Sequence, residues 1–381
     1  MATDAALQGI YVRASQGSPA GLDLHWPDRP PLAIHPLWLR ERCRDAASLD
    51  LRTEQRLYNP ADLDPDLAIV SVVPLAADRY RVAFSDGKVA VFCAHAILAE
   101  IASPAADVPQ RTPWTVSLNE LPLFDWNADP SDSARLAMLE RFLSLGFIVL
   151  RDVPSEDGAV VQVARRFGFP RETNFGVMFD VRSVPEAGDL AYTPLALDPH
   201  TDNPYRDPVP GIQLLHCLAN RCSGGLSTLV DGLAVAEALA AESPEALHVL
   251  ARTPVRFRYV DSSTELVETA PIVRLDAAGG FVAIHYSPRL DSTPLLPPDE
   301  LASFYGARRV LDRMLRSDRF ERRFRLDDRD LVMFDNRRLL HGRTEFDPAE
   351  GLRHLQGCYI DGDGPRSLYR VLRRRQAGAS A

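Results

Sequence analysis

The sequence predicts a mainly β fold with flanking helices, in which a small β-rich N-terminal domain precedes a larger domain of the sandwich or jelly-roll type. Three observations support this prediction. Short apolar runs separated by turn residues recur along the chain, and helical periodicity is confined to a few segments. Helices that flank many short strands fit a sandwich or jelly roll better than a doubly wound sheet. No Gly-x-Gly-x-x-Gly follows a strand, so a dinucleotide-binding sheet lacks its fingerprint.

The N-terminal domain is expected to span residues 1–105. Its predicted elements are strands at 32–35 and 69–73, a hairpin formed by 80–84 and 89–92, and a helix at 95–101. The segment Ser85-Asp-Gly-Lys88 supplies a glycine-containing turn for that hairpin. Prolines and polar residues at 103–113 indicate a linker, so the second domain is expected to span residues 106–381.

The second domain begins with a predicted helix at 131–145, for which Ser133 is a candidate N-cap. Its further predicted elements are a buried strand at 147–153, helices at 160–167, 233–251 and 298–316, and an apolar strand at 330–336 that leads into a turn. Strands and loops occupy most of the intervening sequence, which is the pattern of a β core flanked by helices.

The basic residues exclude two classes of enzyme. Of the 43 basic residues, only Lys88 is a lysine, an excess of arginine that is typical of GC-rich coding. A Schiff-base or pyridoxal-phosphate enzyme needs a lysine amine, and a P-loop needs Gly-Lys-Ser/Thr. Lys88 lies in the predicted hairpin turn and fits neither requirement.

The net charge and the number and spacing of the cysteines limit the kinds of partner and the cellular compartment that we expect. A net charge of −9 with no basic block argues against a nucleic-acid partner. No window approaches the roughly 18 apolar residues of a membrane span, and the N-terminus lacks the features of a signal peptide. Five scattered cysteines without a Cys-x-x-Cys motif fit a cytoplasmic protein. We therefore expect a cytoplasmic protein that acts on neither nucleic acid nor membrane.

The segment Asp198-Pro-His200-Thr-Asp202 indicates a metal site. Side chains two residues apart on a strand point to the same side, so His200 and Asp202 can offer an imidazole and a carboxylate to one ion. His341 is a candidate third ligand. Two histidines and one carboxylate on one face of a metal leave positions open for a co-substrate and O₂, which suits a non-haem Fe(II) oxygenase.

A His-x-Asp pair alone is weak evidence, because a chain with nine histidines contains one by chance about as often as not. Arg353, which lies twelve residues beyond His341, strengthens the interpretation. An oxygenase that uses 2-oxoglutarate needs a cation for the distal carboxylate, and a guanidinium binds carboxylates in a bidentate manner. Thr228 offers a hydroxyl to the same carboxylate.

In this order, these residues resemble those of the taurine-dioxygenase-like Fe(II)/2-oxoglutarate oxygenases, and more closely the γ-butyrobetaine hydroxylase branch. The matching segments, which extend over nearly the whole chain, are Trp38-Leu-Arg-Glu-Arg-Cys43, Gly211-Ile-Gln-Leu-Leu-His-Cys217, Phe334-Asp-Asn-Arg-Arg-Leu-Leu-His-Gly-Arg343 and Arg353-His-Leu-Gln-Gly-Cys-Tyr359. The resemblance implies a double-stranded β-helix (jelly roll) catalytic domain and a homodimer.

The resemblance also implies the chemistry. His200, Asp202 and His341 would hold Fe(II), and Arg353, together with Thr228, would bind the 2-oxoglutarate carboxylate. The enzyme would use O₂ to hydroxylate an unactivated C–H bond of a small molecule, with succinate and CO₂ as the other products.

Enzymes of this branch bind a trimethylammonium group in an aromatic cage, where the cation faces the ring quadrupoles. The matching positions in this chain are Phe175, Phe179, Tyr192 and Tyr359, all of them aromatic. The resemblance therefore implies a cage at these positions. Phe175 and Phe179 are four residues apart, a spacing that fits either a loop or a helical turn.

The residues expected around the anionic end of the substrate, opposite its trimethylammonium group, differ from those of the butyrobetaine enzymes. Ser287 and Arg289 lie in a segment where the butyrobetaine enzymes have asparagines, and Asp189 also stands at an asparagine position. An extra guanidinium at Arg289, helped by Asn203 and Tyr205, suits a doubly charged head better than a carboxylate. The hydroxylase of 2-(trimethylamino)ethylphosphonate is similar in this respect, so the expected substrate is that phosphonate or γ-butyrobetaine.

One feature of the family is missing. The animal enzymes have an N-terminal zinc site of three cysteines and a histidine, and here only Cys43 of that cluster remains, with Asp45, Ser48 and Lys88 near the other positions. A structural zinc needs four nitrogen or sulfur ligands, so we expect no structural zinc. Cys93 and His95 offer a separate pair of ligands, for which packing is the simpler role.

Three other functions fit parts of the sequence. A taurine-like or aryloxyalkanoate oxygenase shares the metal site but has no need of four aromatic positions. A catalytically silent jelly-roll binding domain has no need of intact ligands together with Arg353. A mononuclear zinc hydrolase needs a general base beside a bound water and would ignore 2-oxoglutarate.

Overall fold

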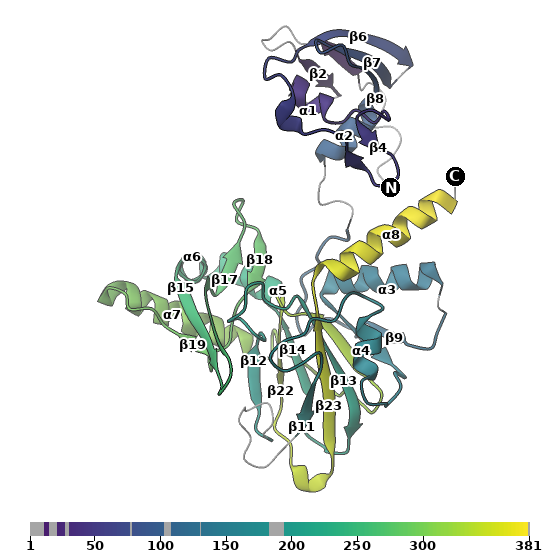
Figure 1. Ribbon diagram of the computed structural model, residues 1–381. Coiled ribbons are helices and arrows are strands. Elements are labelled where there is room, and N and C mark those ends of the chain that lie inside the picture. Colours follow the sequence, from purple (N-terminus) through teal and green to yellow (C-terminus); the bar gives the residue numbers. More distant parts are fainter. Residues whose placement is uncertain are drawn as a thin grey trace. The chain divides into compact units, whose positions relative to one another are not determined.

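A computed structural model describes residues 11–14, 21–26, 30–76, 78–102, 108–129, 131–182 and 194–379. The chain forms two compact units, Met1–Asp107 and Val108–Ala381, whose elements are labelled in Figure 1. The domain boundary predicted after residue 105 falls within residues 103–107, which lie outside the described ranges.

The described part of the N-terminal unit contains two three-stranded antiparallel sheets, in the orders β1-β2-β3 and β6-β7-β8. Its elements are β1 (Tyr11–Ala14), β2 (Leu22–His25), β3 (Leu32–Ile34), α1 (Pro36–Arg40), β4 (Leu49–Asp50), β5 (Gln55–Arg56), the 3₁₀ helix η2 (Pro60–Asp62), β6 (Ile69–Ala76), β7 (Arg79–Phe84), β8 (Val89–Cys93) and α2 (Ala94–Ala102). Alternate strand residues, such as Leu22 and Leu24 of β2 and Val82 and Phe84 of β7, are buried in one core. The predicted hairpin and the helix that follows it are confirmed.

The single lysine of the chain lies in the turn between β7 and β8. In that turn Gly87 has φ 82°, a left-handed conformation that glycine adopts readily. The Lys88 ammonium forms an ion pair with Asp45, with 2.5 Å between Nζ and Oδ1. Burial raises the pKa of Asp45, but hydrogen bonds from Lys88, Ser48 and the Ala47 amide outweigh it and lower that pKa to about 2.

Replacement of Asp45 by asparagine should lower the free energy of unfolding of the N-terminal unit at neutral pH by less than about 1 kcal/mol, because the pair is partly exposed to solvent. The pKa of Asp45 is about 2 in the folded chain, against an ordinary value of 3.8. The ion pair therefore stabilises the fold fully above the ordinary value, and its contribution is lost as the pH falls through about 2. Urea unfolding of wild type and D45N over this range measures the effect, and a difference that grows toward low pH would contradict it.

Two sheets form the core of the C-terminal unit. The larger has six strands in the order β11-β23-β13-β21-β10-β9, and the smaller has four in the order β12-β22-β14-β20. These strands are β9 (Leu123–Asp125), β10 (Phe147–Arg151), β11 (Phe179–Arg182), β12 (Leu197–His200), β13 (Ile212–Asn220), β14 (Ser227–Asp231), β20 (Arg322–Phe324), β21 (Leu331–Asp335), β22 (Leu339–Arg343) and β23 (Arg353–Ile360). The predicted mainly β jelly roll with flanking helices is confirmed.

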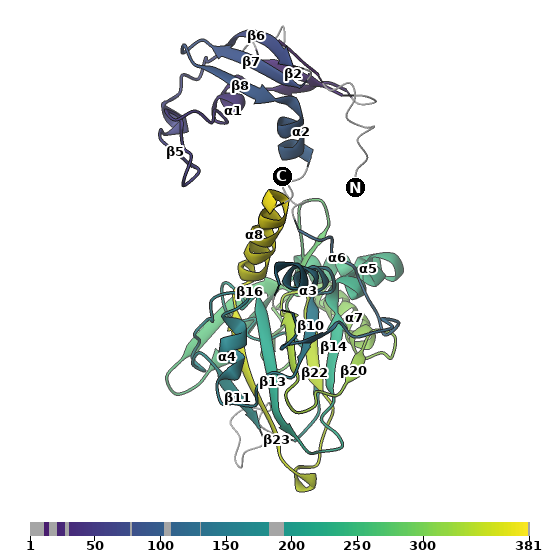
Figure 2. The same cartoon turned by 90° about the vertical axis from the view of Figure 1, so that its right-hand side faces the viewer.

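Helices and short strands surround the two sheets (Figures 1 and 2). They are α3 (Asp132–Leu145), α4 (Ala159–Ala164), α5 (Gly232–Glu242), α6 (Pro244–Arg252), β15 (Pro254–Val260), β16 (Glu265–Pro271), β17 (Val273–Leu275), β18 (Phe281–Ile284), β19 (Asp291–Ser292), α7 (Pro298–Leu315), the 3₁₀ helix η4 (Pro348–Glu350) and α8 (Asp363–Ala379). Helix α3 contacts β10 and α8, and α4 contacts β13 and β23, so these helices cover the larger sheet. Helices α5, α6 and α7 pack together beside β15 to β19.

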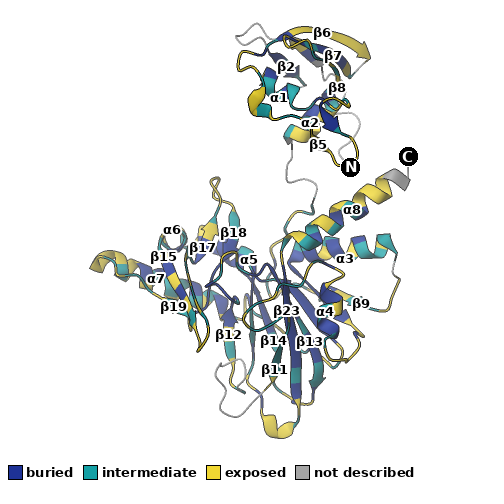
Figure 3. Cartoon of the chain, viewed as in Figure 1, coloured by how far each residue is buried: buried dark blue, intermediate teal, exposed yellow. Residues whose placement is uncertain are grey.

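The four inner strands of the larger sheet are buried on both faces, as their continuous apolar runs predict (Figure 3). On β10, Ile148 and Leu150 join the core under the helices. The alternate residues Phe147 and Val149 join the core between the two sheets. The two-residue period of a strand thus divides one apolar run between two cores, one under the helices and one between the sheets.

The predicted start of one helix and the predicted length of another are wrong. The N-cap of α3 is Ser131, whose hydroxyl accepts from the Ala134 amide, whereas the sequence indicates Ser133. The helix predicted at 233–251 is two helices, α5 and α6, and α6 starts at Pro244. A proline fits the first turn of a helix but not its interior, because it has no amide hydrogen to donate.

A buried ion pair joins distant parts of the C-terminal unit. The Arg338 guanidinium donates to both carboxylate oxygens of Asp231, at 2.9 and 2.7 Å, and the two side chains are 1% and 0% exposed. The same guanidinium donates to the carbonyls of Ser144 and Thr112, each at 2.7 Å. Asp231 also accepts from the Trp114 amide at 3.0 Å. Every charged atom of the pair is thus compensated, as a buried pair requires.

Among the residues that the structure describes, no helix combines the length and apolar character that crossing a membrane requires. All five cysteines are free thiols.

Candidate active site

His200, Asp202 and His341 come together where β12 pairs with β22. His200 stands opposite His341 in this ladder, and their ring centroids are 4.4 Å apart. The Nε2 atom of His200 is 3.5 Å from Asp202 Oδ1, and the Nε2 atom of His341 is 3.8 Å from Oδ2. One ligand atom from each side chain lies within 4.8 Å of the others. Two imidazoles and one carboxylate in this arrangement can hold one metal ion.

The prediction that His200 and Asp202 share one strand is wrong in detail. Strand β12 ends at His200, and Asp202 lies in the loop beyond it. Asn336 holds this loop: its Oδ1 accepts from the Asp202 amide at 2.8 Å, and its Nδ2 donates to the Asp202 carbonyl at 2.9 Å. Asn336 is therefore a positioning residue. Its position in the polar turn after β21 does not indicate this role in the sequence.

Further hydrogen bonds orient two of the three ligands. The Asp198 carbonyl lies 2.8 Å from His200 Nδ1, which leaves Nε2 directed at Asp202. The Tyr359 hydroxyl donates to Asp202 Oδ2 at 2.8 Å. Partners of this kind fix the ring and carboxylate orientation of metal ligands.

Electrostatics gives these groups the protonation states that a metal needs. Burial raises the pKa of Asp202, but His341, His200 and the Tyr359 hydroxyl lower it well below its usual range. Burial, together with nearby His200, lowers the pKa of His341 to about 3. At neutral pH the carboxylate is thus ionised and the His341 imidazole is neutral, which leaves a lone pair for coordination.

Arg353 and Thr228 are both buried in the core, Arg353 on β23 of the larger sheet and Thr228 on β14 of the smaller sheet. They are 5% and 2% exposed, and Thr228 stands opposite Gly342, the residue that follows His341. The Arg353 guanidinium donates to the Gly225 carbonyl at 3.1 Å. The Thr228 hydroxyl has no hydrogen-bond partner among the described residues. A buried donor without a partner is uncommon in a folded protein and fits a site that a ligand completes.

Arg343 is a second buried guanidinium at this site. It lies on β22 two residues after His341 and is 6% exposed. Burial, with the nearby charges of Arg353 and Arg289, lowers its pKa to about 10. Guanidinium groups in a water-poor site create a positive potential that favours an anion. The sequence shows Arg343 only as part of the motif around His341.

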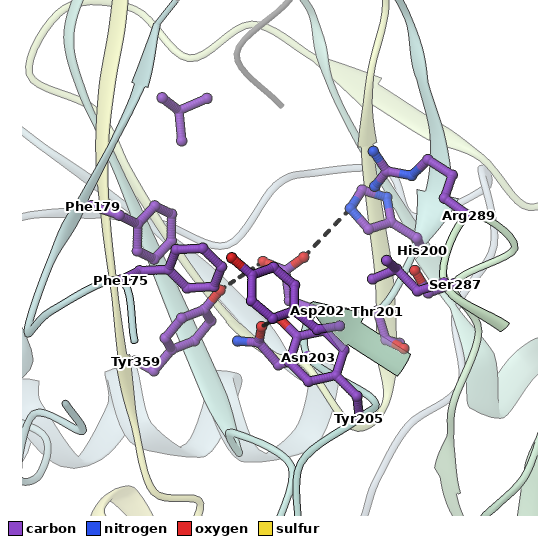
Figure 4. Close-up of a pocket in the computed structure, with 13 residues that line it drawn as sticks. Phe175, Phe179, His200, Thr201, Asp202, Asn203, Tyr205, Ser287, Arg289 and Tyr359 are labelled. Atoms are coloured by element: carbon purple, nitrogen blue, oxygen red, sulfur yellow. Dashed lines mark hydrogen bonds and ion pairs between the residues drawn. The ribbon is translucent and has the colours of Figure 1, made fainter. Parts of the chain in front are cut away.

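A cavity of about 290 Å³ opens beside His200 and Asp202 (Figure 4). Its lining consists of Phe175, Phe179, Val181, His200, Thr201, Asp202, Asn203, Tyr205, Tyr259, Ser287, Arg289, Leu290 and Tyr359. Seven of the nine substrate residues expected from the resemblance belong to this lining. The other two, Asp189 and Tyr192, lie outside the described residues.

Aromatic side chains form one side of the cavity. The ring centroids of Phe179 and Tyr359 are 5.3 Å apart, and those of Phe175 and Tyr259 are 5.5 Å apart. Phe175 lies in a turn and Phe179 begins β11, so the segment is a loop followed by a strand. Tyr259, on β15, also stacks on Tyr205 at 5.2 Å. Nothing in the sequence marks Tyr259 as a site residue, because its strand carries no motif.

Polar groups form another side of the cavity. In Figure 4 the aromatic rings of Phe175, Phe179 and Tyr359 lie on one side of Asp202, and Arg289 and Ser287 lie on the other, beside His200. The Ser287 hydroxyl and the Asn203 Nδ2 are buried without a hydrogen-bond partner among the described residues.

A jelly roll that carries two imidazoles and one carboxylate beside a mixed aromatic and cationic cavity defines a mononuclear non-haem iron oxygenase. Comparison with known proteins supports this class. The sequence model of the taurine catabolism dioxygenase TauD, TfdA family matches residues 108–359. That of the "Gamma-butyrobetaine hydroxylase-like, N-terminal" family matches residues 14–96.

Individual relatives agree with these matches. The chain is 38% identical to a gamma-butyrobetaine dioxygenase of Pseudomonas sp. (strain AK-1), over 93% of this chain and 94% of the relative. It is 29% identical to a gamma-butyrobetaine dioxygenase of Pongo abelii, over 93% and 95%. It is 28% identical to a mitochondrial trimethyllysine dioxygenase of Rattus norvegicus, over 88% and 82%. The chain belongs to the TauD, TfdA family, and it is a dioxygenase that depends on Fe(II), 2-oxoglutarate and O₂ and acts on a small molecule.

Proposed function

We propose that the chain hydroxylates an unactivated C–H bond of a small zwitterion that carries a trimethylammonium group at one end and an anion at the other. The candidates are 2-(trimethylamino)ethylphosphonate and γ-butyrobetaine. The observation that carries the proposal is the division of the cavity, with aromatic rings on one side of Asp202 and Arg289 on the other (Figure 4).

The residues at the centre fit the expected iron. The donor set of His200, Asp202 and His341 matches the ligands of non-haem Fe(II) oxygenases. Fe(II), when bound with 2-oxoglutarate and O₂, supplies the oxidising power that turns C–H into C–OH as 2-oxoglutarate becomes succinate and CO₂. Asn336 holds the backbone of Asp202 in place, and the Tyr359 hydroxyl holds its carboxylate, by the hydrogen bonds described above.

The buried guanidinium groups fit the co-substrate. Arg353 would bind the distal carboxylate of 2-oxoglutarate, and the unpartnered hydroxyl of Thr228 would donate to it. Burial of Arg353 makes this interaction strong, because little water competes for the charge. Arg343 adds a second positive charge nearby.

Gly225 supports the orientation of Arg353, and its replacement by alanine should raise the KM for 2-oxoglutarate by about tenfold or more. A Cβ at Gly225 would lie 2.6 Å from Arg353 Nε, and its φ of +68° disfavours any side chain. Steady-state kinetics with varied 2-oxoglutarate measures the change. The matched control is Gly279→Ala, which has φ +84° and nothing within 4 Å of the added atom. An equal rise of the KM in both variants would show that general strain, and not displacement of Arg353, is the cause.

The aromatic side of the cavity would hold the trimethylammonium group. A quaternary cation is attracted to the faces of aromatic rings, with about 0.5–2 kcal/mol for each contact. Phe175, Phe179 and Tyr359 provide these rings, and Tyr259 adds a fourth among the described residues. Both the gamma-butyrobetaine and the trimethyllysine dioxygenases among the relatives are named for trimethylammonium compounds. A taurine-like substrate would leave this aromatic surface without a role.

The polar side of the cavity would hold the anion. Arg289 supplies a full charge, and the Ser287 hydroxyl is a donor without a partner in the described structure. The Tyr205 hydroxyl donates to Asn203 Oδ1 and directs the amide nitrogen away from itself. A phosphonate offers three oxygens to these donors, one more than a carboxylate, which favours the phosphonate.

Arg289→Met should weaken the apparent affinity for the zwitterion by about 10- to 100-fold, the range for loss of a charge-assisted hydrogen bond. The loss should be larger for the phosphonate than for γ-butyrobetaine, because the phosphonate carries more negative charge. The KM for 2-oxoglutarate should stay close to that of the wild type. Kinetics with each substrate varied in turn measures both values, and a loss confined to 2-oxoglutarate would place Arg289 at the co-substrate.

The deciding experiment is a substrate panel. Fe(II)-loaded protein is incubated with 2-oxoglutarate and one trimethylammonium carboxylate or phosphonate at a time, and succinate formation is followed. We expect succinate formation that is stimulated by the phosphonate, by γ-butyrobetaine or by both. Turnover that neither compound stimulates would refute the proposed substrate class. Homodimerisation, a cytoplasmic location and the absence of nucleic-acid and membrane partners stay predictions.

A further inference from the structure

A second group of metal-ligating side chains lies in the N-terminal unit. Asp78 immediately precedes β7, Cys93 is the last residue of β8, and His95 is the second residue of α2. Strands β7 and β8 are antiparallel with Arg79 opposite Cys93. The Ala94 amide also donates to the Asp78 carbonyl at 2.8 Å, which fixes the backbone on both sides of the group.

The thiol and the imidazole converge on a single carboxylate oxygen. Cys93 Sγ is 3.0 Å and His95 Nδ1 is 3.2 Å from the same Oδ2 atom of Asp78. Potential ligand atoms of the three side chains lie within 4.8 Å of one another. Hydrogen bonds from Cys93 and His95 lower the pKa of Asp78, so the carboxylate is ionised at neutral pH. Of the described residues, only this group and the active-site triad bring three such ligands together.

We propose that Asp78, Cys93 and His95 form a second metal site, which binds a zinc-like divalent cation through three protein ligands. Zinc accepts thiolate, imidazole and carboxylate ligands together, usually in a tetrahedral arrangement. The Asp78 and His95 side chains are 35% and 33% exposed, so water reaches the group and can fill the fourth position. A thiolate also distinguishes this site from the triad, whose nitrogen and oxygen ligands suit Fe(II).

The charges balance when the cation binds. The Cys93 thiol releases its proton to solvent and binds as a thiolate, and His95 coordinates as a neutral imidazole through Nδ1. One thiolate and one carboxylate then neutralise the two positive charges of the ion. Because one proton leaves, the affinity for the cation should rise with pH.

The proposed site is separate from the corner of the same unit that contains Cys43. There, the Lys88 ammonium is paired with Asp45, and a positive charge at that position disfavours a cation. A cation at Asp78, Cys93 and His95 would instead tie the start of β7 to the end of β8 and the start of α2 (Figure 2). Its role would be to stabilise the N-terminal unit, independently of the iron site, and its binding would overturn the expectation from the sequence that the chain has no structural zinc.

Cobalt(II) titration of the full-length protein tests the site. A cobalt–thiolate bond gives an intense near-ultraviolet charge-transfer band, which the triad cannot produce because it contains no cysteine. We expect the band to saturate at one equivalent of thiolate-bound cobalt and to be displaced by zinc. Cys93→Ser should abolish the band, and His95→Gln should weaken cobalt binding by about tenfold or more. Zinc should also raise the Tm of the N-terminal unit in the wild type and not in Cys93→Ser.

The matched control is Cys43→Ala, which removes the other cysteine of this unit and should keep the band. No band in the wild type overturns the proposal. A band that survives Cys93→Ser but disappears in Cys43→Ala also overturns it, because the thiolate ligand is then Cys43. Circular dichroism of each metal-free variant verifies its fold, and a band lost in two folded cysteine variants alike counts against the assignment to Cys93.

Discussion

Replacement of Asp202 by alanine should reduce substrate-dependent succinate formation by more than about 100-fold, beyond the loss typical of residues that only orient a metal ligand. Asp202 is the only carboxylate of the triad, and its two oxygens face the Nε2 atoms of His200 and His341. Without it, only the two imidazoles remain to hold a divalent cation. Fe(II) binding, measured by equilibrium dialysis, should fall together with the activity, whereas the fold should persist because Asp202 lies in a loop.

Asp198→Asn is the matched control for Asp202→Ala. This carboxylate pairs with Arg316 at the surface at 2.8 Å, whereas the contact with His200 uses the Asp198 backbone carbonyl. The substitution removes a negative charge four residues away from Asp202 and leaves every ligand in place. Activity near that of the wild type is expected. Retained activity in Asp202→Ala, or an equal loss in Asp198→Asn, would contradict the assigned role of the Asp202 carboxylate.

Replacement of Arg338 by methionine should lower the free energy of unfolding of the C-terminal unit by about 3–5 kcal/mol, the range for breaking a buried ion pair. The substitution leaves Asp231 buried as an unpaired carboxylate, because the two side chains are 1% and 0% exposed. It also removes donors from the carbonyls of Ser144 and Thr112. Urea unfolding followed by tryptophan fluorescence, to which Trp114 contributes from a buried position in the same unit, measures the change.

Arg337→Met provides the control for Arg338→Met. Arg337 is the preceding residue and is only partly buried, so its loss should change stability by about 0.5 kcal/mol or less. The double variant with Asp231→Asn should be more stable than the sum of the two single changes predicts, because it removes both charges of the pair. Additive effects in this cycle would show that Arg338 and Asp231 do not stabilise each other.

Short, strong patterns made the fold and the centre of the site predictable. The hairpin around Ser85–Lys88 and the apolar strand at Phe147 are local signals, and the structure contains both. His200, Asp202 and His341 stand out because two of them lie in one short segment and the third lies in a recognisable motif. The structure brings all three together.

Other features depend on contacts between distant segments, which no local pattern reports. Tyr259 reaches the cavity because β15 passes beside the loop of Tyr205, 54 positions earlier in the chain, and their rings stack. Asn336 is 134 positions from Asp202, whose loop it holds. Asp78 lies beside Cys93 and His95 because β7 and β8 pair in antiparallel register. A search of the sequence for closely spaced metal ligands therefore finds Cys93 and His95 but not Asp78.

Because of its position, the reactivity of Lys88 can be used to measure the opening of the N-terminal unit. Apart from the α-amino group, it is the only primary amine in 381 residues, and its side chain is 19% exposed within the pair with Asp45. Amine-reactive reagents should therefore label the folded chain slowly at this position and rapidly once the N-terminal unit opens. A lysine-specific protease would likewise cut the chain once, after Lys88, so the rate at which two fragments appear would measure how readily this unit opens.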